Sequence, residues 1–71
     1  MDTIVEFTNA ETDRVLHRVI NAIVPQVGEY VSFGPRLGIL AVTAVLWKFD
    51  PEDTRRCVVR VACMVATPPM K

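Results

Sequence analysis

The arginine side chains are the groups in this sequence best suited to a functional site, because they can bind anions. Six of the eight basic residues are arginines, and Arg55, Arg56 and Arg60 lie close together. A guanidinium group binds a carboxylate or a phosphate through two parallel hydrogen bonds, which lysine cannot do. The cluster therefore indicates an anion-binding site. The simpler interpretation, which we favour for the cluster as a whole, is a solvated strand end whose arginines pair with the acids at 50–53.

Arg60 is the most informative arginine, because it stands between Val59 and Val61 in an apolar run. A charge there is costly unless it is paired or solvated, so Arg60 must reach a carboxylate, line a wet pocket or face solvent. If the protein binds an anionic, nucleotide-like ligand, the predicted binding residues are Arg60, Arg56, Arg36, Tyr30 and Trp47. The aromatic members would stack on a base, although a core position is the favoured interpretation for Trp47 and Phe33.

No arrangement typical of catalysis or metal binding occurs in the sequence. His17 is the only histidine and has no nucleophile or orienting acid beside it. Cys57 and Cys63 fall on one predicted strand, about 20 Å apart at ~3.3 Å per residue, which is too far for a disulfide. Their spacing does not suit zinc either. We predict a non-enzyme without metal or cofactor, with two reduced cysteines, in the cytoplasm.

Length and composition restrict the possible partners. Seventy-one residues form one domain, 1–71, and such a chain buries only roughly 60% of its unfolded surface, so oligomerisation would supplement a marginal core. Eight acidic residues balance the eight basic ones, so we expect no bulk nucleic-acid binding. The apolar run 37–47 is shorter than the ~20 residues that span a bilayer, and we expect no membrane association.

The stretch 37–66 organises the predicted fold. Two apolar runs, 39–49 and 56–65, flank a polar turn, which predicts a long antiparallel hairpin. In the first run, alternation predicts one face comprising Ile39, Ala41, Thr43, Val45, Trp47 and Phe49, and another comprising Leu40, Val42, Ala44, Leu46 and Lys48. In the second run, it predicts an apolar face comprising Cys57, Val59, Val61, Cys63 and Val65. Because both faces of the first run are largely apolar, we expect an all-β, barrel-like antiparallel sheet that self-associates into a homo-oligomer.

The remaining elements are shorter. Residues 3–8 alternate as a strand with Val5 and Phe7 inward, and residues 29–33 form another strand. Two interpretations of 14–20 stay open: a strand paired with 3–8 after a turn at 9–13, or part of a helix at about 10–23, which would make the fold α+β. The tail at about 67–71 should be loose.

The segments 10–19 (Ala-Glu-Thr-Asp-Arg-Val-Leu-His-Arg-Val) and 24–31 (Val-Pro-Gln-Val-Gly-Glu-Tyr-Val) resemble a group of small uncharacterised β proteins of bacteria and phages. Those proteins carry a Glu-Thr-Gly turn before Val-Leu-His, and a Pro-x-Val-Gly-Glu-x-Val entry into a strand. The resemblance covers about residues 3–65 and implies an all-β fold without implying any activity. The chain departs from the pattern at Asp13, where glycine is usual, and in its longer turn at 34–38.

Two functions are expected on this basis. The first is a small oligomeric binding module, of the kind a phage could use against host defence by sequestering a nucleotide-like anionic signal. The alternative is a protein-interaction module or inhibitor that binds a partner protein through an exposed strand edge or apolar face.

Overall fold

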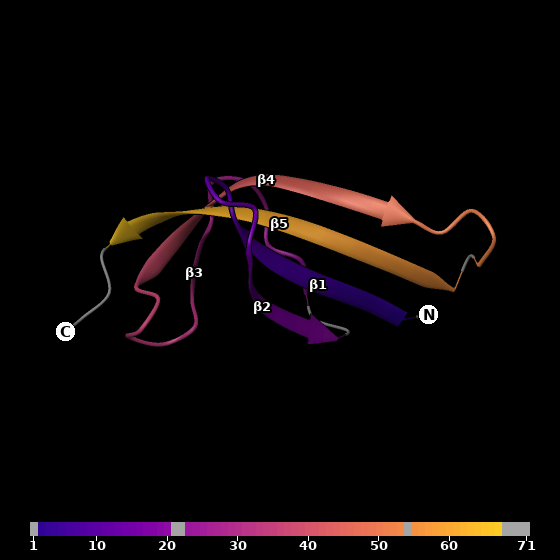
Figure 1. Ribbon diagram of the computed structural model, residues 1–71, viewed down its shortest axis with the longest axis horizontal. Helices are drawn as coiled ribbons and strands as arrows, with labels where there is room; N and C mark the ends of the chain where they lie inside the picture. Colours follow the sequence, from indigo (N-terminus) through magenta and orange to yellow (C-terminus); the bar gives the residue numbers. More distant parts are fainter. Residues whose placement is uncertain (1, 21–22, 54, 68–71) are drawn as a thin grey trace.

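The chain folds into one sheet of five strands in a computed structural model that describes residues 2–20, 23–53 and 55–67. The strands are β1 (Asp2–Asn9), β2 (Val15–Ile20), β3 (Tyr30–Ser32), β4 (Ile39–Phe49) and β5 (Arg56–Thr67). Their order across the sheet is β2-β1-β5-β4-β3 (Figure 1). The predicted all-β fold is confirmed, as is the predicted antiparallel pairing of 39–49 with 56–65. The loose tail was predicted at about 67–71; Thr67 ends β5, and residues 68–71 lie outside the described residues.

One pairing departs from an entirely antiparallel sheet. β5 lies between β4 and β1, and it runs antiparallel to β4 but parallel to β1 over the whole length of β1. The central strand therefore joins two hairpin-like units, β1–β2 and β3–β4–β5, into a mixed sheet. Alternation along a strand reports which side chains share a face and does not report the direction of a neighbouring strand.

Residues 15–20 form a strand, so the helix interpretation of this segment is wrong. The side-chain oxygen of Asn9 accepts hydrogen bonds from the backbone N–H groups of Glu11 and Thr12, at 2.8 and 3.2 Å. These bonds close a turn where the helix would have begun. After the turn, Val19 lies opposite Val5 and His17 lies opposite Phe7, as the strand interpretation predicted.

A β-bulge at Thr43 changes which side chains of β4 face the core. Val42 lies opposite Cys63 and Ala44 lies opposite Ala62, so Thr43 is an extra residue in the ladder. The core side therefore carries Leu40 and Val42 before the bulge, and the odd-numbered residues after it. The two uninterrupted faces predicted for this strand were wrong, and the side of β4 away from the core is less apolar than they implied.

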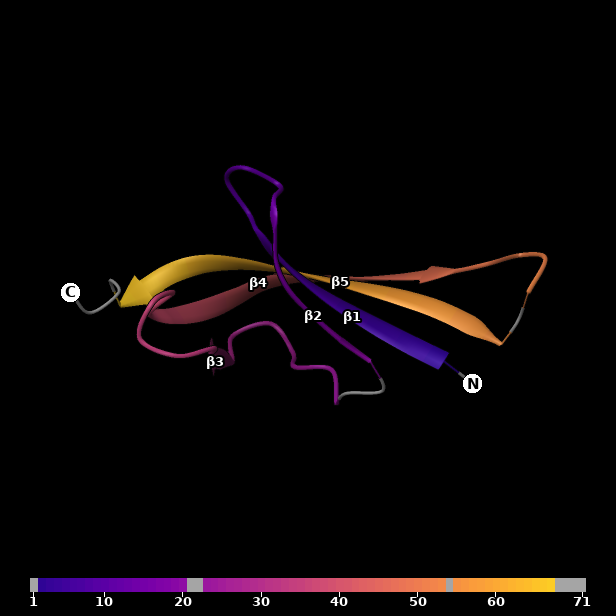
Figure 2. The same ribbon diagram turned by 60° about the horizontal axis from the view of Figure 1, so that its bottom comes forward.

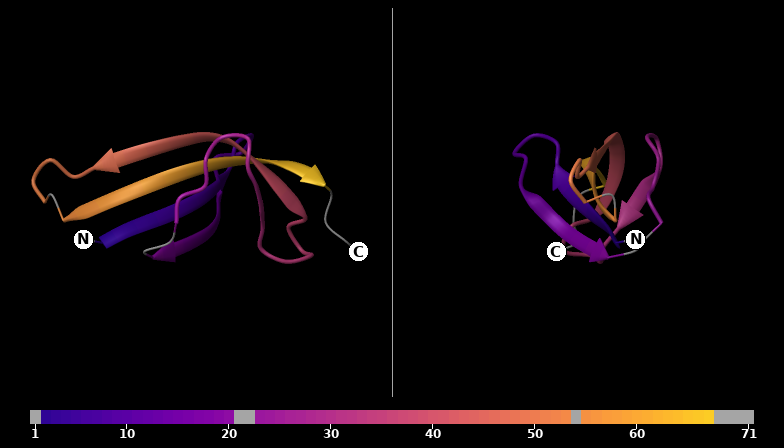
Figure 3. Two further views of the ribbon diagram at one scale, coloured as in Figure 1. Left: turned by 180° about the vertical axis from the view of Figure 1, so that it is seen from behind. Right: turned by 90° about the vertical axis from the view of Figure 1, so that its right-hand side faces the viewer.

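The sheet curls into a half barrel (Figure 3), and the core lies on its inner side. Its buried members are Val5, Phe7, Leu40, Val42, Cys57, Val59, Val61 and Cys63. Phe33, just after β3, packs its ring against Phe7 and His17 at centroid distances of 4.7 Å, so side chains link the two edges of the sheet. Val65 is exposed although it was predicted on the core face, because β1 ends opposite Cys63 and offers no neighbour beyond it.

The molecule is elongated, with principal extents of 44 × 19 × 18 Å. The β4–β5 hairpin forms one end of it, and the β1–β2 turn projects to one side (Figure 2). Within the described residues, no helix is long and apolar enough to cross a bilayer.

Candidate functional site

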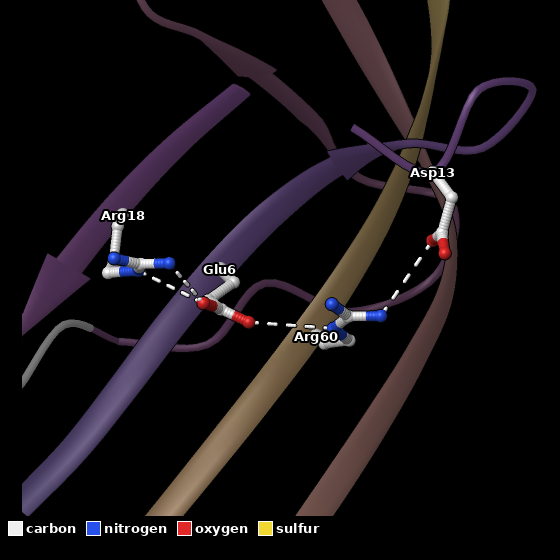
Figure 4. Close-up of polar contacts among 4 residues, drawn as sticks. All are labelled: Glu6, Asp13, Arg18 and Arg60. Carbon is white, nitrogen blue, oxygen red and sulfur yellow. Dashed lines mark hydrogen bonds and ion pairs between the residues drawn. The ribbon is translucent and has the colours of Figure 1, made fainter. Parts of the chain in front are cut away.

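A row of alternating charges crosses the face of the sheet opposite the core (Figure 4). Glu6 on β1 lies directly between Arg18 on β2 and Arg60 on β5 in the strand register. Its Oε2 accepts hydrogen bonds from Nη2 and Nε of Arg18 at 2.7 and 3.0 Å. Its Oε1 lies 3.5 Å from Nε of Arg60, and Nη1 of Arg60 lies 3.8 Å from Oδ1 of Asp13. We call these four residues the charge ladder.

Asp13 reaches the ladder from an unusual backbone conformation. Its φ is +61°, the only positive value among the described non-glycine residues. Aspartate tolerates this left-handed region better than most residues, although glycine adopts it without strain. The turn thereby gains a carboxylate beside Arg60 that a glycine could not supply.

The arginines determine the ionisation of Glu6. Partial burial raises its pKa, but the hydrogen bonds and charges of Arg18 and Arg60 outweigh burial and hold the pKa below the usual 4.5. The Glu6 side chain is only 14% exposed, so these partners compensate the cost of taking its charge out of water. Arg60 is thus paired with two acids at long distances, and within the described parts of the chain these ion pairs involve only its Nε and Nη1.

A groove of about 630 Å³ lies next to the ladder, at the hairpin end of the sheet. Its lining residues are Ile4, Glu6, Ile20, Lys48, Phe49, Asp50, Arg56, Cys57, Val58 and Arg60. Five of these ten side chains are apolar, and they and the aliphatic stems make most of the exposed lining surface apolar; of the charged side chains, three are cationic and two are anionic. This combination suits a ligand that has an apolar part and carries negative charge.

Two of the five predicted site residues, Arg56 and Arg60, come together in this groove. The expected pairing with the turn acids holds only in part: Asp53 lies 3.6 Å from Arg55 and 3.9 Å from Arg56, whereas Arg60 pairs with Glu6 and Asp13 instead. The guanidinium of Arg56 is therefore only loosely held at the groove.

The other three predicted residues lie outside this groove. Trp47 borders a second hollow of about 400 Å³ with the segment 24–27, and its ring stacks on Phe49 at 6.2 Å. The preferred interpretation of Trp47 as core was wrong, since it is 49% exposed. Tyr30 on β3 and Arg36 in the turn before β4 are exposed and line neither hollow.

Sequence reasoning missed the groove residues that come from other strands. Glu6 and Lys48 join Arg60 only through the strand register, and the parallel pairing that sets Glu6 beside Arg60 has no local signal. One hint was present, because Glu6 is an acidic residue in a predicted strand between two core positions, Val5 and Phe7.

Cys57 and Cys63 are both free and buried, as predicted. Burial raises the pKa of the Cys63 thiol, which keeps it in its unreactive form. Neither cysteine belongs to a group of three or more potential metal ligands in the described parts of the chain.

No protein family, curated protein or solved structure matches this chain. The resemblance of 10–19 and 24–31 to small bacterial and phage proteins therefore stays a prediction.

Proposed function

We propose that the protein is a non-catalytic binding module whose groove takes a small anionic ligand with an apolar part, such as a nucleotide. The observation that carries this proposal is the convergence of Lys48, Arg56 and Arg60 on a groove with an apolar lining. Its volume of about 630 Å³ falls within the range of roughly 300–1,000 Å³ that is usual for small-molecule sites.

An anionic ligand could compete with the carboxylates that now pair with the two groove arginines. Arg60 meets its carboxylate partners at 3.5 and 3.8 Å, and Arg56 meets Asp53 at 3.9 Å. These contacts are longer than the roughly 2.7–2.9 Å of a strong charge-assisted hydrogen bond. A phosphate could therefore gain short bonds to either guanidinium group without first breaking tight ones.

The sequestration of a nucleotide signal, in the cytoplasm of a phage-infected cell, is the role we infer for such a module. It is supported by the two free, buried cysteines, which suit a reducing compartment, and by the sequence resemblance described above. A module of this kind needs a binding site and no catalytic groups.

Titration calorimetry with ADP and with a cyclic dinucleotide tests the proposal. We expect at least one of them to bind, and Arg56→Gln to weaken binding about tenfold, the effect of losing roughly 1.4 kcal/mol of interaction. Arg55→Gln is the matched control, because Arg55 also contacts Asp53 but does not line the groove. Equal losses in both variants, or no binding by the wild-type protein together with no nucleotide retained in native mass spectrometry, would refute the groove as a nucleotide site.

A second candidate function is favoured by one feature of the sheet. The hairpin end of β4 has no strand beside it on the edge away from β5 within the described residues. Exposed strand edges bind other chains by adding a strand to the sheet. A protein-interaction module that works through this edge is therefore the alternative proposal.

A further inference from the structure

The edge of β4 is covered over only part of its length. β3 pairs with residues 39–41, and the backbone N–H and C=O groups of Val42 bond to Glu29 and Gly28 at 2.9 and 3.0 Å. The preceding segment then turns away beneath the sheet (Figure 1). Among the described residues, none pairs with 43–49 on the side away from β5. We call residues 43–49 the uncovered edge.

The uncovered edge has few of the features that protect strand edges from pairing. Natural edges are shortened, or carry charges, prolines or bulges. This one has a bulge at its start and a single charge, Lys48, and contains no proline. Leu46, Trp47 and Phe49 are large apolar side chains on it that stay about half or more exposed.

We propose that the uncovered edge pairs antiparallel with the same edge of a second copy of this chain, about a two-fold axis at Leu46. The inference rests on the second candidate function, that this edge is an interaction surface, and is independent of the groove. It identifies the partner as the chain itself and gives the register.

The register follows from symmetry and charge. In an antiparallel pair, residues that lie directly opposite each other point to the same face of the sheet. A two-fold axis between two identical strands must therefore lie between the two copies of one residue. An axis at Leu46, the midpoint of 43–49, pairs the whole uncovered edge and sets Trp47 opposite Val45 of the second copy. It also sets Lys48 opposite Ala44, whereas an axis at Lys48 would oppose two like charges.

The composition of the chain favours a second copy as the occupant. Its formal net charge is zero, so two copies meet without overall repulsion. The pairing would shield apolar side chains on both faces of the edge in a domain whose own core is small. Seven paired residues make a small interface compared with the usual roughly 800 Å² per partner, so we expect a weak dimer that forms only at high protein concentration.

Sedimentation velocity from the low micromolar to the millimolar range tests the proposal. The wild-type protein should change from monomer to dimer, and Leu46→Lys should stay monomeric because it opposes two lysines. Val65→Lys is the matched control, since Val65 is 54% exposed and Leu46 is 55% exposed, but Val65 lies on the central strand β5. An equimolar mixture of Leu46→Lys and Leu46→Glu should form a mixed dimer, which requires position 46 to face itself.

Three results would overturn the proposal: a wild-type monomer at millimolar concentration, a dimer that Val65→Lys disrupts equally, or no mixed dimer from folded variants. Hydrogen exchange of the wild-type protein decides the case in which a variant fails to fold. Protection of those amides of 43–49 that point away from β5 should then rise with protein concentration, because the other amides of this segment already bond to β5. If the protein is a monomer and these amides are unprotected, only self-pairing is contradicted. If it is a monomer and these amides are strongly protected, the edge is already occupied within the monomer, and binding of any added strand there is contradicted as well.

Discussion

At the scale of single residues, Glu6 explains how an arginine can occupy the middle of an apolar strand. Arg60 has a carboxylate beside it on the neighbouring strand and another in the β1–β2 turn. Its presence is therefore partly structural, as pairing of this kind offsets the cost of desolvating a charge. The same guanidinium lines the groove, so deleting Arg60 would remove its ion pairs together with its proposed contact to a ligand, which makes Arg56 the better test residue.

The charge ladder predicts a specific pH dependence of stability. The folded-state pKa of Glu6 lies below its ordinary value of 4.5, so its stabilising effect is fully present above about pH 4.5 and is lost as the pH falls through the folded-state pKa. Glu6→Gln should lower the free energy of unfolding by about 1 kcal/mol at pH 7. Urea denaturation at pH 7 and pH 3 should show the difference from wild type shrink in acid.

Glu11→Gln is the control for that measurement, because Glu11 is an exposed acid in the β1–β2 turn and lies outside the ladder. A difference between wild type and Glu6→Gln that stays constant from pH 7 to pH 3 would show that the ion pairs contribute nothing to stability.

At the scale of elements, the sequence predicted four of the five strands directly and left β2 undecided between strand and helix. Apolar alternation located the hairpin because β-branched side chains dominate both of its strands. It failed at Thr43, where the bulge reverses the two faces of β4, and a bulge depends on the partner strand rather than on local composition. The groove could not be predicted for a similar reason, because the neighbours of β5 are distant in sequence.

Valines of β5 that lie beside β1 should stabilise the fold more than valines that lie beyond the end of β1. Val61 is fully buried between β1 and β4, whereas Val65 lies past the last residue of β1. Val61→Ala should lower the free energy of unfolding by about 2 kcal/mol, from lost burial and the cavity left behind. Val65→Ala should change it by less than about 0.5 kcal/mol. Denaturant unfolding of both variants checks this, and equal losses would mean that β5 is buried along its whole length.

At the scale of the whole molecule, the elongated half-barrel carries two surfaces that meet at its hairpin end. The groove lies beside the charge ladder, on the face opposite the core, and the uncovered edge runs along the hairpin strand β4. Lys48 and Phe49 belong to both, so pairing at the edge would bring a second copy next to the groove. We predicted self-association because both faces of the strand at 39–49 read as apolar. The bulge weakens that argument, and the uncovered edge is now the observation that supports self-association.

The groove itself is tested most directly by mapping amide chemical shifts in two-dimensional NMR spectra while ADP or a cyclic dinucleotide is added. The proposed site predicts shifts concentrated at Glu6, Lys48 and Val58, with no comparable change at Tyr30 or Arg36. Shifts centred on Tyr30 and Arg36, or a spectrum that neither nucleotide changes, would contradict the groove as the binding site.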